Sequence, residues 1–450
     1  MKVKKDKVKI ITLGCSKNLV DSEFIMAQLK SNDIELVEDE NECNTVIINT
    51  CGFIDIAKQE SIDTILKSVE QKKKGKIQKI FVAGCLSDRY KSELEKEIPE
   101  VNKYFGATDK KQTLLEILKS FGVDYKKNLV GERMLTTPSH YAYLKISDGC
   151  DNPCSFCAIP IMRGKHKSKE LKDILIEAQK LASKGVREII LIGQDTTYWG
   201  LDLDKKRELS NVLTGISEIT DIEWIRLMYA YPSRFPPDVI NAIKDNEKIC
   251  NYIDIPIQHI SDKVLKSMRR GITKRNLIAL LEKIRNEIPG IAVRTTLMVG
   301  YPDETEKDFQ ELMDFTKEFK FDRLGVFTYS NEEGTTASVL PDRIPKKEKM
   351  LRQKLILEAQ RVISVEKNAN SIDKIYKVLI DRKEEDYYIG RTYKDAPEID
   401  QEVYVTNNKT LEIGKFYDVI IYDYEEFDLF GELAGEQKMG NWKMVRAKKI

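Results

Sequence analysis

The 450-residue sequence predicts an α/β protein with an N-terminal parallel α/β domain, a partial barrel of six βα units and a small C-terminal antiparallel β-barrel. Strand-like and helix-like segments alternate over most of the chain, as in parallel sheets that are covered by helices. Short strands with period-two alternation then follow one another closely, which is typical of small β-barrels. The length allows about three domains, at 100–200 residues for each.

The first domain is expected over residues 8–122. Its strands are indicated by short β-rich runs, and the segments between them have helical patterns. This alternation predicts a parallel sheet with helices on its faces. The expected strands are Val8–Leu13, Thr45–Asn49 and Lys79–Ala83, and the expected helices are Asp21–Ser31 and Ile54–Lys73.

A cysteine with a glycine neighbour follows each of these three strands. Ligands of open parallel sheets bind outside the carboxyl ends of the strands, so the three thiols are expected to converge. Glycine lets the backbone approach a bulky inorganic group. Three unrelated, buried cysteines are the alternative. The set Cys15, Cys51 and Cys85, here named the N-terminal trio, is therefore a candidate metal site.

The second domain is expected over residues 136–368, after the polar linker Met134–His140. Six strand-like runs predict a laterally open partial barrel, because a closed barrel of this type takes eight. A charged helix from Lys346 to about Lys367 follows Pro345 and leads out of the barrel. The six runs are Tyr143–Ser147, Glu188–Ile192, Trp224–Met228, Tyr252–Pro256, Ala292–Met298 and Arg323–Phe327.

Three closely spaced cysteines directly follow the first of these strands. Cys150, Cys154 and Cys157, here named the loop trio, can place three thiols on one side of a loop and leave a fourth metal position open. A structural zinc ion needs four ligands, and the nearest histidine, His166, lies nine residues past Cys157. Thiolates suit both zinc and iron, but an iron-sulfur cluster with one open iron fits this spacing better.

The third domain is expected over residues 369–437. This segment has eight basic and seventeen acidic residues, a net charge of −9. Binding to phosphate backbones needs clustered positive charge, so the domain is expected to repel RNA and attract a basic protein. A solvated acidic face without a partner is the alternative. The expected strands are Ile375–Ile380, Tyr387–Thr392, Gln401–Val405, Tyr417–Tyr424 and Leu429–Leu433.

The sequence shows no pattern of an export signal or a membrane span, and a cytoplasmic protein without membrane association is expected. The eight cysteines are therefore not expected to form a disulfide framework. Cys43 and Cys250 belong to no motif and are expected to be buried small side chains.

The run Cys150–Cys157 resembles the cluster loop of radical S-adenosylmethionine (SAM) enzymes. Together with the N-terminal trio it resembles the methylthiotransferase family, over nearly the whole chain. The resemblance implies a cluster domain, a radical SAM core and a TRAM domain, with a 4Fe-4S cluster on each trio. It makes the loop trio catalytic, with SAM on its open iron receiving one electron and the resulting 5′-deoxyadenosyl radical abstracting a hydrogen. The N-terminal cluster would bind the sulfur to be transferred.

Three regions are similar to the branch of this family that modifies a ribosomal protein: Thr12–Glu23, Leu144–Asn152 with Ala158–Pro160, and Gly390–Asp400. The tRNA-modifying branch typically has Gln-Met-Asn where this chain has Ser16-Lys17-Asn18. The resemblance implies addition of a methylthio group to the β-carbon of an aspartate in small-subunit ribosomal protein twelve, with two SAM molecules and two 4Fe-4S clusters.

The expected partners are this basic ribosomal protein, met through the acidic TRAM domain, and an electron donor such as flavodoxin or ferredoxin. A monomer is expected. One alternative is a tRNA adenosine methylthiotransferase with the same clusters, against which the acidic third domain argues. A second alternative is a non-catalytic, zinc-stabilised binding module.

Side chains that contact the cofactor are expected on the loops after the barrel strands. Gln194 and Asp195 follow the second strand, Gln258 and His259 follow the fourth, and Arg294 on the fifth could meet a carboxylate. Each of the five could equally be a satisfied polar group at the rim of the barrel.

Overall fold

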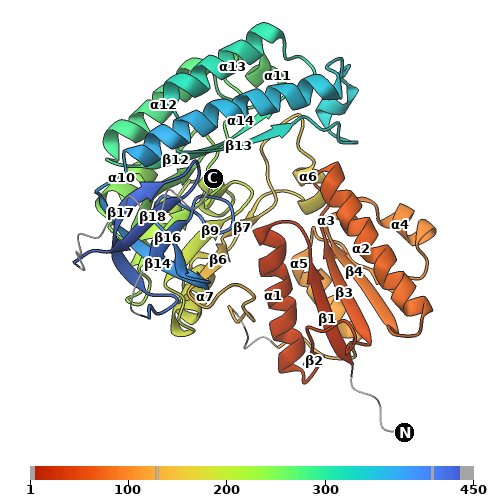
Figure 1. The fold of residues 1–450 in the computed structure, drawn as a ribbon. Coiled ribbons are helices and arrows are strands. Elements are labelled where there is room, and N and C mark those ends of the chain that lie inside the picture. Colours follow the sequence, from red (N-terminus) through yellow and green to blue (C-terminus); the bar gives the residue numbers. More distant parts are fainter. Residues whose placement is uncertain (1–5, 127–128, 130, 407–409, 436–450) are drawn as a thin grey trace. The chain divides into compact units, whose positions relative to one another are not determined.

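A computed structural model describes residues 6–126, 129, 131–406 and 410–435. The chain divides into two compact units, Met1–Ala359 and Gln360–Ile450. The first unit contains two parallel sheets and the second a small barrel (Figure 1). The three domain boundaries stay predictions, and the predicted end at residue 437 lies outside the described residues.

The N-terminal sheet has five parallel strands in the order β2-β1-β3-β4-β5. All six residues of the central strand β3 are buried, as expected between two helical layers. Thr12 pairs with Asn49, and Thr50 pairs with Gly84, so the three central strands end at the same edge. The strands are β1 (Lys7–Thr12), β2 (Glu35–Leu36), β3 (Thr45–Thr50), β4 (Lys79–Gly84) and β5 (Lys103–Tyr104).

Helices cover both faces of this sheet. Val46 and Ile48 belong to the apolar cluster that contains residues of α2, whereas Ile47 belongs to the cluster with α1 and α5. The helix predicted to begin at Asp21 begins instead at Ser16, directly after Cys15. The helices are α1 (Ser16–Ser31), α2 (Asp55–Lys73), α3 (Cys85–Arg89), α4 (Lys91–Glu97) and α5 (Lys110–Ser120).

The second sheet has six parallel strands in the order β13-β12-β11-β10-β9-β6. β6 and β13 lie at its two edges, so the sheet is open, and the predicted partial barrel is confirmed. The strands are β6 (Tyr141–Lys145), β9 (Glu188–Ile192), β10 (Trp224–Leu227), β11 (Ile249–Asp254), β12 (Ala292–Val299) and β13 (Arg323–Thr328).

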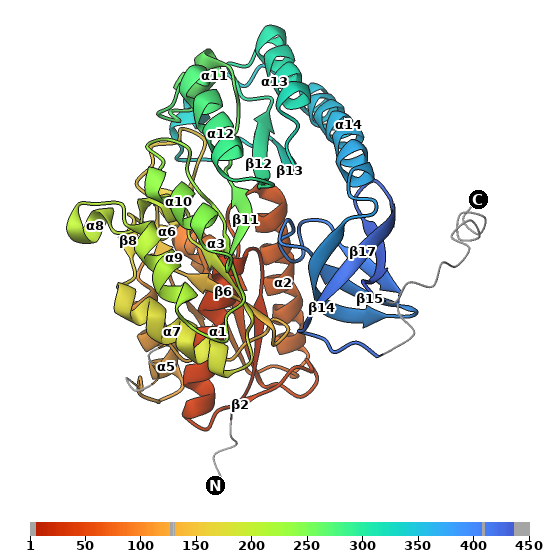
Figure 2. The ribbon, with the colours of Figure 1, turned by 90° about the vertical axis from the view of Figure 1, so that its left-hand side faces the viewer.

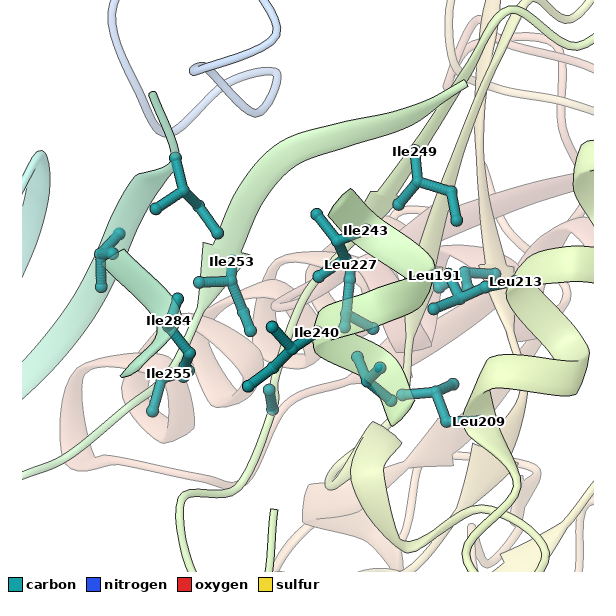
Figure 3. Close-up of a cluster of buried hydrophobic side chains, with 14 of the residues drawn as sticks. Leu191, Leu209, Leu213, Leu227, Ile240, Ile243, Ile249, Ile253, Ile255 and Ile284 are labelled. Atoms are coloured by element: carbon teal, nitrogen blue, oxygen red, sulfur yellow. The ribbon is translucent and has the colours of Figure 1, made fainter. Parts of the chain in front are cut away.

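One large apolar cluster fills the space between this sheet and its helices. Figure 3 shows Ile240 and Ile243 of α10 beside Leu227 of β10. Burial of this apolar surface holds the helices on the sheet. The helices are α6 (Ile159–Arg163), α7 (Leu171–Ser183), α8 (Leu201–Asp204), α9 (Leu209–Ser217), α10 (Pro237–Asp245), α11 (Asp262–Ser267), α12 (Lys274–Glu287) and α13 (Glu306–Phe319).

Strand positions between those apolar residues carry charged side chains. Next to Leu227 of the apolar cluster, Arg226 forms a buried ion pair with Glu188 at 2.7 Å. Asp254 of β11 forms an ion pair with Arg294 of β12 at 2.9 Å. Since successive side chains point to opposite faces of a strand, these charges lie on the face turned away from the helices. That face can therefore bind a polar ligand.

The second unit is a closed barrel in the order β14-β15-β16-β18-β17 (Figure 2). The predicted small barrel is confirmed, except that β16 pairs with β18 in parallel while the other pairs are antiparallel. The helix α14 (Lys346–Ala369) begins in the first unit and ends in the second. The barrel strands are β14 (Ile375–Glu384), β15 (Tyr387–Arg391), β16 (Val403–Thr406), β17 (Phe416–Tyr424) and β18 (Leu429–Leu433). Among the described residues, no helix is long and apolar enough to span a bilayer.

Candidate active site

The N-terminal trio lies at the carboxyl edge of the five-stranded sheet. Cys15 follows β1, Cys51 follows β3, and Cys85 begins α3 after β4. Gly14 has a φ of +87°, and a Cβ at this position would lie 2.6 Å from the Cβ of Cys51 and 2.8 Å from its Sγ. Glycine at position 14 therefore allows the first two members of the trio to approach each other.

Asn18, in the first turn of α1, holds this edge together. Its Nδ2 donates hydrogen bonds to the carbonyl oxygens of Leu13 at 2.8 Å and Thr50 at 3.0 Å. Its Oδ1 lies 4.0 Å from the Sγ of Cys85. Asn49 donates from its own Nδ2 to the Asn18 carbonyl at 2.9 Å. This buried, fully bonded amide fixes the ends of β1 and β3 relative to each other.

The pKa values of Cys15 and Cys51 in the N-terminal trio are shifted in opposite directions. Desolvation would raise the pKa of Cys15, but the charges of Lys17 and Arg163, with nearby backbone N–H groups, hold that pKa below its usual value. Burial raises the pKa of Cys51 to about 11. Cys15 therefore ionises more readily than Cys51, which ionises when a metal takes the place of its proton.

The loop trio is positioned by a short hairpin in which β7 (Ser147–Asp148) pairs with β8 (Lys167–Ser168). Gly149 has a φ of +72°, and a Cβ there would lie 2.1 Å from the carbonyl oxygen of Lys165. The N–H of Cys150 donates to the Gly164 carbonyl at 3.2 Å. Glycine at position 149 thus lets the first cysteine of the loop dock against the returning chain.

Three polar groups reach the thiols of the loop trio. Asn152 Nδ2 donates to the Sγ of Cys150 at 3.5 Å, and Arg270 Nη1 donates to the Sγ of Cys154 at 3.3 Å. The Tyr231 hydroxyl lies 3.4 Å from the Sγ of Cys154. Hydrogen bonds of this kind orient metal-bound thiolates and tune the potential of a cluster.

Burial dominates the titration of the loop trio. It raises the pKa of Cys150 to about 12, and it raises the pKa of Cys157 to about 12 as well. These two thiols would stay protonated at neutral pH in the free protein. A bound metal would displace their protons, so metal binding at this loop releases protons.

Arg163, which ends α6, connects the two trios. Its Nε donates to the Sγ of Cys85 at 3.2 Å, and its Nη2 donates to the Oδ1 of Asn18. Its Nη1 donates to the Oδ1 of Asp148 at 3.0 Å. Because Asp148 lies in β7, just before the loop trio, one buried side chain joins the two thiol sites.

Two lysines and a second aspartate complete this buried network. Lys145 pairs with Asp148 at 2.7 Å and also with Asp21, and Lys110 pairs with Asp21. Burial would raise the pKa of Asp148, but Lys145, Lys110 and Arg163 hold it well below its usual value. Three cations face two carboxylates, so the network carries an excess positive charge beside Cys85.

Gln194 and Asp195 follow β9 and lie beside this network. Gln194 Nε2 donates to Asp148 at 3.3 Å, while its Oε1 is buried and has no hydrogen-bond partner among the described residues. Asp195 accepts hydrogen bonds from Asn152 Nδ2 at 2.8 Å and from Thr197 Oγ1 at 2.6 Å. The structure brings both residues to the loop trio, and their contact with a cofactor stays a prediction.

Gln258 and His259 follow β11. The backbone of Gln258 has a φ of +71° and forms a bridge to β12 at Leu297. The ring of His259 is fully buried, and its Nδ1 accepts a hydrogen bond from the N–H of Ser261 at 3.0 Å. Burial lowers the pKa of His259 to about 3, so the ring is neutral at physiological pH. A role of either residue in cofactor binding stays a prediction.

Arg294 meets a carboxylate of the protein itself. It pairs with Asp254 at 2.9 Å, and the other oxygen of Asp254 accepts the N–H of Tyr229 at 3.0 Å. The carbonyl of Tyr229 accepts hydrogen bonds from the N–H and the Oγ1 of Thr196. Tyr229 has a φ of +58°, a strained conformation that persists because these bonds hold its backbone. Contact of Arg294 with a cofactor stays a prediction.

Both trios have the donor chemistry that an iron-sulfur cluster requires. Each offers three thiols, and Asn152, Arg163 and Arg270 direct N–H groups at their sulfur atoms. The glycines at positions 14 and 149 leave the space in which the chain closes around the thiols. Among the described residues, no three His, Cys, Asp or Glu side chains form a site for a single metal ion. The role of the six cysteines as cluster ligands stays a prediction.

Three family models match successive parts of the chain. "Uncharacterized protein family UPF0004" matches residues 7–106, "Radical SAM superfamily" matches residues 144–316, and "TRAM domain" matches residues 372–434. The family models and the parallel sheets define a radical SAM enzyme. The radical SAM methyltransferase TsrM from Kitasatospora setae, solved with cobalamin and a 4Fe-4S cluster, has the same fold. Its TM-score is 0.53 at 14% identity, over 72% of this chain and 75% of that chain.

Closer relatives give the family within this class. The ribosomal protein uS12 methylthiotransferase RimO of Cytophaga hutchinsonii is 55% identical over 433 residues, which cover 96% of this chain and 98% of that protein. The protein of the same name from Christiangramia forsetii is 52% identical over 431 residues, 96% of this chain and 95% of that protein. The chain belongs to the RimO family of radical SAM methylthiotransferases and is a transferase.

Sequence reasoning missed four side chains of this region: Lys17, Arg163, Tyr229 and Arg270. Each acts across a contact between segments that are far apart in the sequence, such as the 78 positions between Cys85 and Arg163. The signal for Arg163 was its place six residues after the loop trio, in a basic stretch that also contains Lys165 and Lys167. No comparable signal marked Tyr229.

Proposed function

We propose that this chain attaches a methylthio group to the β-carbon of an aspartate in ribosomal protein uS12. Each trio would hold a 4Fe-4S cluster, and two SAM molecules would be used in different ways. The observation that supports this most is Arg163, which bonds both to Cys85 of the N-terminal trio and to Asp148 before the loop trio. Two thiol sites joined within one compact unit suit a reaction that needs both.

The chemistry explains why two different sites are needed. The C–H bond at an aspartate β-carbon offers no acidic proton to a general base, so a radical carried by a cofactor has to remove the hydrogen. Cys150, Cys154 and Cys157 would hold the cluster, whose chemistry would be to give one electron for cleavage of SAM to methionine and a 5′-deoxyadenosyl radical, and that radical would take up the hydrogen. The second SAM molecule provides the methyl group for a sulfur at the N-terminal trio.

Residues around the loop trio would position its ligands and limit the access of water. Asp195 holds Asn152, which donates to Cys150, and Arg270 donates to Cys154. Phe156, between two of the cysteines, packs against a small buried cluster that contains Val264, Met268, Tyr301, Tyr329 and Ala337. This packing keeps apolar atoms next to the cysteine loop, where water would otherwise reach the thiols.

The acidic second unit supports a protein substrate. Residues 369–437 carry a net charge of −9. Glu425 and Asp428 lie in the turn between β17 and β18, next to Phe427, whose side chain is 51% exposed. Negative charge around an exposed aromatic ring attracts a basic protein and repels RNA. The names of the relatives from Cytophaga hutchinsonii and Christiangramia forsetii also specify uS12.

Mass spectrometry of cells that lack this chain tests the proposal. The methylthio mark should disappear from uS12 and remain on bulk tRNA, and expression of the wild-type chain should restore it. Expression of a Cys43→Ala chain should restore it equally, because Cys43 is buried outside both trios. Loss of the mark from tRNA alone would contradict the proposal and support a tRNA methylthiotransferase.

A further inference from the structure

Lys17 has an unusual environment for a lysine. It lies in the first turn of α1, two residues after Cys15, and is only 7% exposed. Its Nζ lies 2.9 Å from the centroid of the Tyr229 ring, just beyond the end of β10 in the barrel. Among the residues that the structure describes, its ammonium group has no hydrogen bond and no ion pair.

The other buried basic side chains near the trios all have partners. Lys110 and Lys145 pair with Asp21, Arg163 bonds to Asp148, and Arg294 pairs with Asp254. Arg270 donates to Cys154. Lys17 therefore differs from each of them in lacking an anionic or sulfur partner within the described chain.

The physical consequence is a positive charge that has no anionic partner among the described residues, on a side chain that is largely withdrawn from water. Removing an ammonium group from much of its water is unfavourable, and a cation–π contact offsets only part of this penalty. An anion at Nζ would offset the remainder. Lys17 follows Cys15 by two residues in the first turn of α1, so its side chain begins at the N-terminal trio and reaches the barrel at Tyr229.

Tyr229 provides a rigid surface for this ammonium group. Its N–H donates to Asp254 at 3.0 Å and its carbonyl accepts from Thr196, although its φ of +58° is unfavourable for a bulky side chain. Asp254 is held in turn by Arg294 at 2.9 Å. The backbone of Tyr229 is therefore fixed at the ends of β9 and β11, from which its ring extends to Lys17.

We propose that Lys17 binds the side-chain carboxylate of the substrate aspartate while the Tyr229 ring fixes its ammonium group. This inference rests on the proposed function. In aspartate the carboxylate is bonded directly to the β-carbon, and that carbon has to meet both a radical from the barrel and a sulfur at the N-terminal trio. The Lys17 side chain begins two residues after Cys15 and its ammonium group lies over the ring of Tyr229 in the barrel, so it extends from one of these two sites toward the other.

Binding of two forms of uS12 tests the assignment, one with the target aspartate and one with asparagine at that position. The iron-loaded wild-type chain and its Lys17→Met, Lys17→Arg and Lys30→Met variants are compared. Lys30 is an exposed lysine on the same helix and serves as the matched control. Lys17→Met should weaken binding of the aspartate form about ten- to a hundred-fold, as expected for a lost charge-assisted hydrogen bond.

The asparagine form should bind equally to the wild-type chain and to Lys17→Met, while Lys17→Arg should recover part of the binding of the aspartate form. Iron content should be the same in all four chains. The assignment would be overturned if Lys17→Met weakened both forms equally, or if it lost iron and left the preference for aspartate intact. If the wild-type chain left uS12 unmodified, the proposed function would be wrong, and the assignment of Lys17, which rests on it, would be wrong as well.

Discussion

The two cysteine trios are built in different ways. The loop trio lies within one run, Cys150–Cys157, which the β7–β8 hairpin positions. The N-terminal trio is gathered from three strand ends between Cys15 and Cys85. The first arrangement depends on one local turn, and the second depends on the order and register of a whole sheet. Local spacing can therefore specify one thiol site, while only the topology of the domain can specify the other.

Removal of a whole trio should give the largest effect. Reconstitution with iron and sulfide should give about eight irons in the wild-type chain and about four in either triple cysteine-to-alanine variant. The two sites use separate thiols, so each should fill without the other. Iron analysis after reconstitution measures this. A double Cys43→Ala, Cys250→Ala chain should keep about eight irons, and loss of all iron from one triple variant would contradict independent sites.

Arg163 and Arg270 allow the comparison to be tested without removing a cysteine. Arg163→Met should lower the free energy of unfolding by about 1–3 kcal/mol, because it removes buried hydrogen bonds to Cys85 and Asp148 while Lys110 and Lys145 still pair with the two carboxylates. Arg270 faces Cys154 and has no such carboxylate partner among its described contacts, so Arg270→Met should cost less. Chemical denaturation measures both.

The same two variants should change the reduction potential of one cluster each. Loss of an N–H donor to sulfur should lower the reduction potential of the neighbouring cluster. Redox titration should show a change only at the N-terminal trio in Arg163→Met and only at the loop trio in Arg270→Met. If either variant changed the reduction potential at both sites, the two clusters would be electrostatically coupled.

The glycines beside the trios should show a smaller effect. Gly149→Ala should cost about 1–3 kcal/mol in the free energy of unfolding, because its φ is +72° and the new Cβ would meet a backbone carbonyl. Gly14→Ala should cost less, since its new Cβ would meet the Cys51 side chain. Thermal denaturation of the two variants measures which of them loses more stability. Gly185→Ala is the control for strain alone, because its φ is +96° and its Cβ would meet nothing within 4 Å.

Charge reversal on the second unit should give the smallest effect and leave both trios unchanged. A Glu425→Lys, Glu426→Lys chain should bind uS12 a few-fold more weakly at low salt, corresponding to about 1 kcal/mol. The difference should shrink as salt screens the charges. Titration at two salt concentrations measures it. Glu385→Lys with Asp386→Lys, at the β14–β15 turn, is the control with the same change in charge.

The sequence predicted the elements of the fold more fully than it predicted the contacts of the site. Strand alternation located the three central strands of the N-terminal sheet and the six strands of the second sheet, but not the two-residue strands β2 and β5. The spacing of Cys150, Cys154 and Cys157 indicated a thiol site from eight residues. The position of the N-terminal trio at one edge of the sheet followed from the rule that parallel strands end together, and the convergence of its three thiols on a metal stays a prediction. The bond from Arg163 to Cys85 and the contact of Lys17 with Tyr229 could not be predicted, because they depend on how two sheets meet.

Products formed by Cys51→Ala and Cys154→Ala chains test most directly whether the two trios have separate roles. Each chain is reconstituted and given SAM, a reductant, sulfide and uS12, and 5′-deoxyadenosine and methylthiolated uS12 are measured. We expect Cys51→Ala to form 5′-deoxyadenosine without methylthiolating uS12, and Cys154→Ala to form neither. Complete loss of 5′-deoxyadenosine in Cys51→Ala, with the loop trio still loaded with iron, would contradict separate roles.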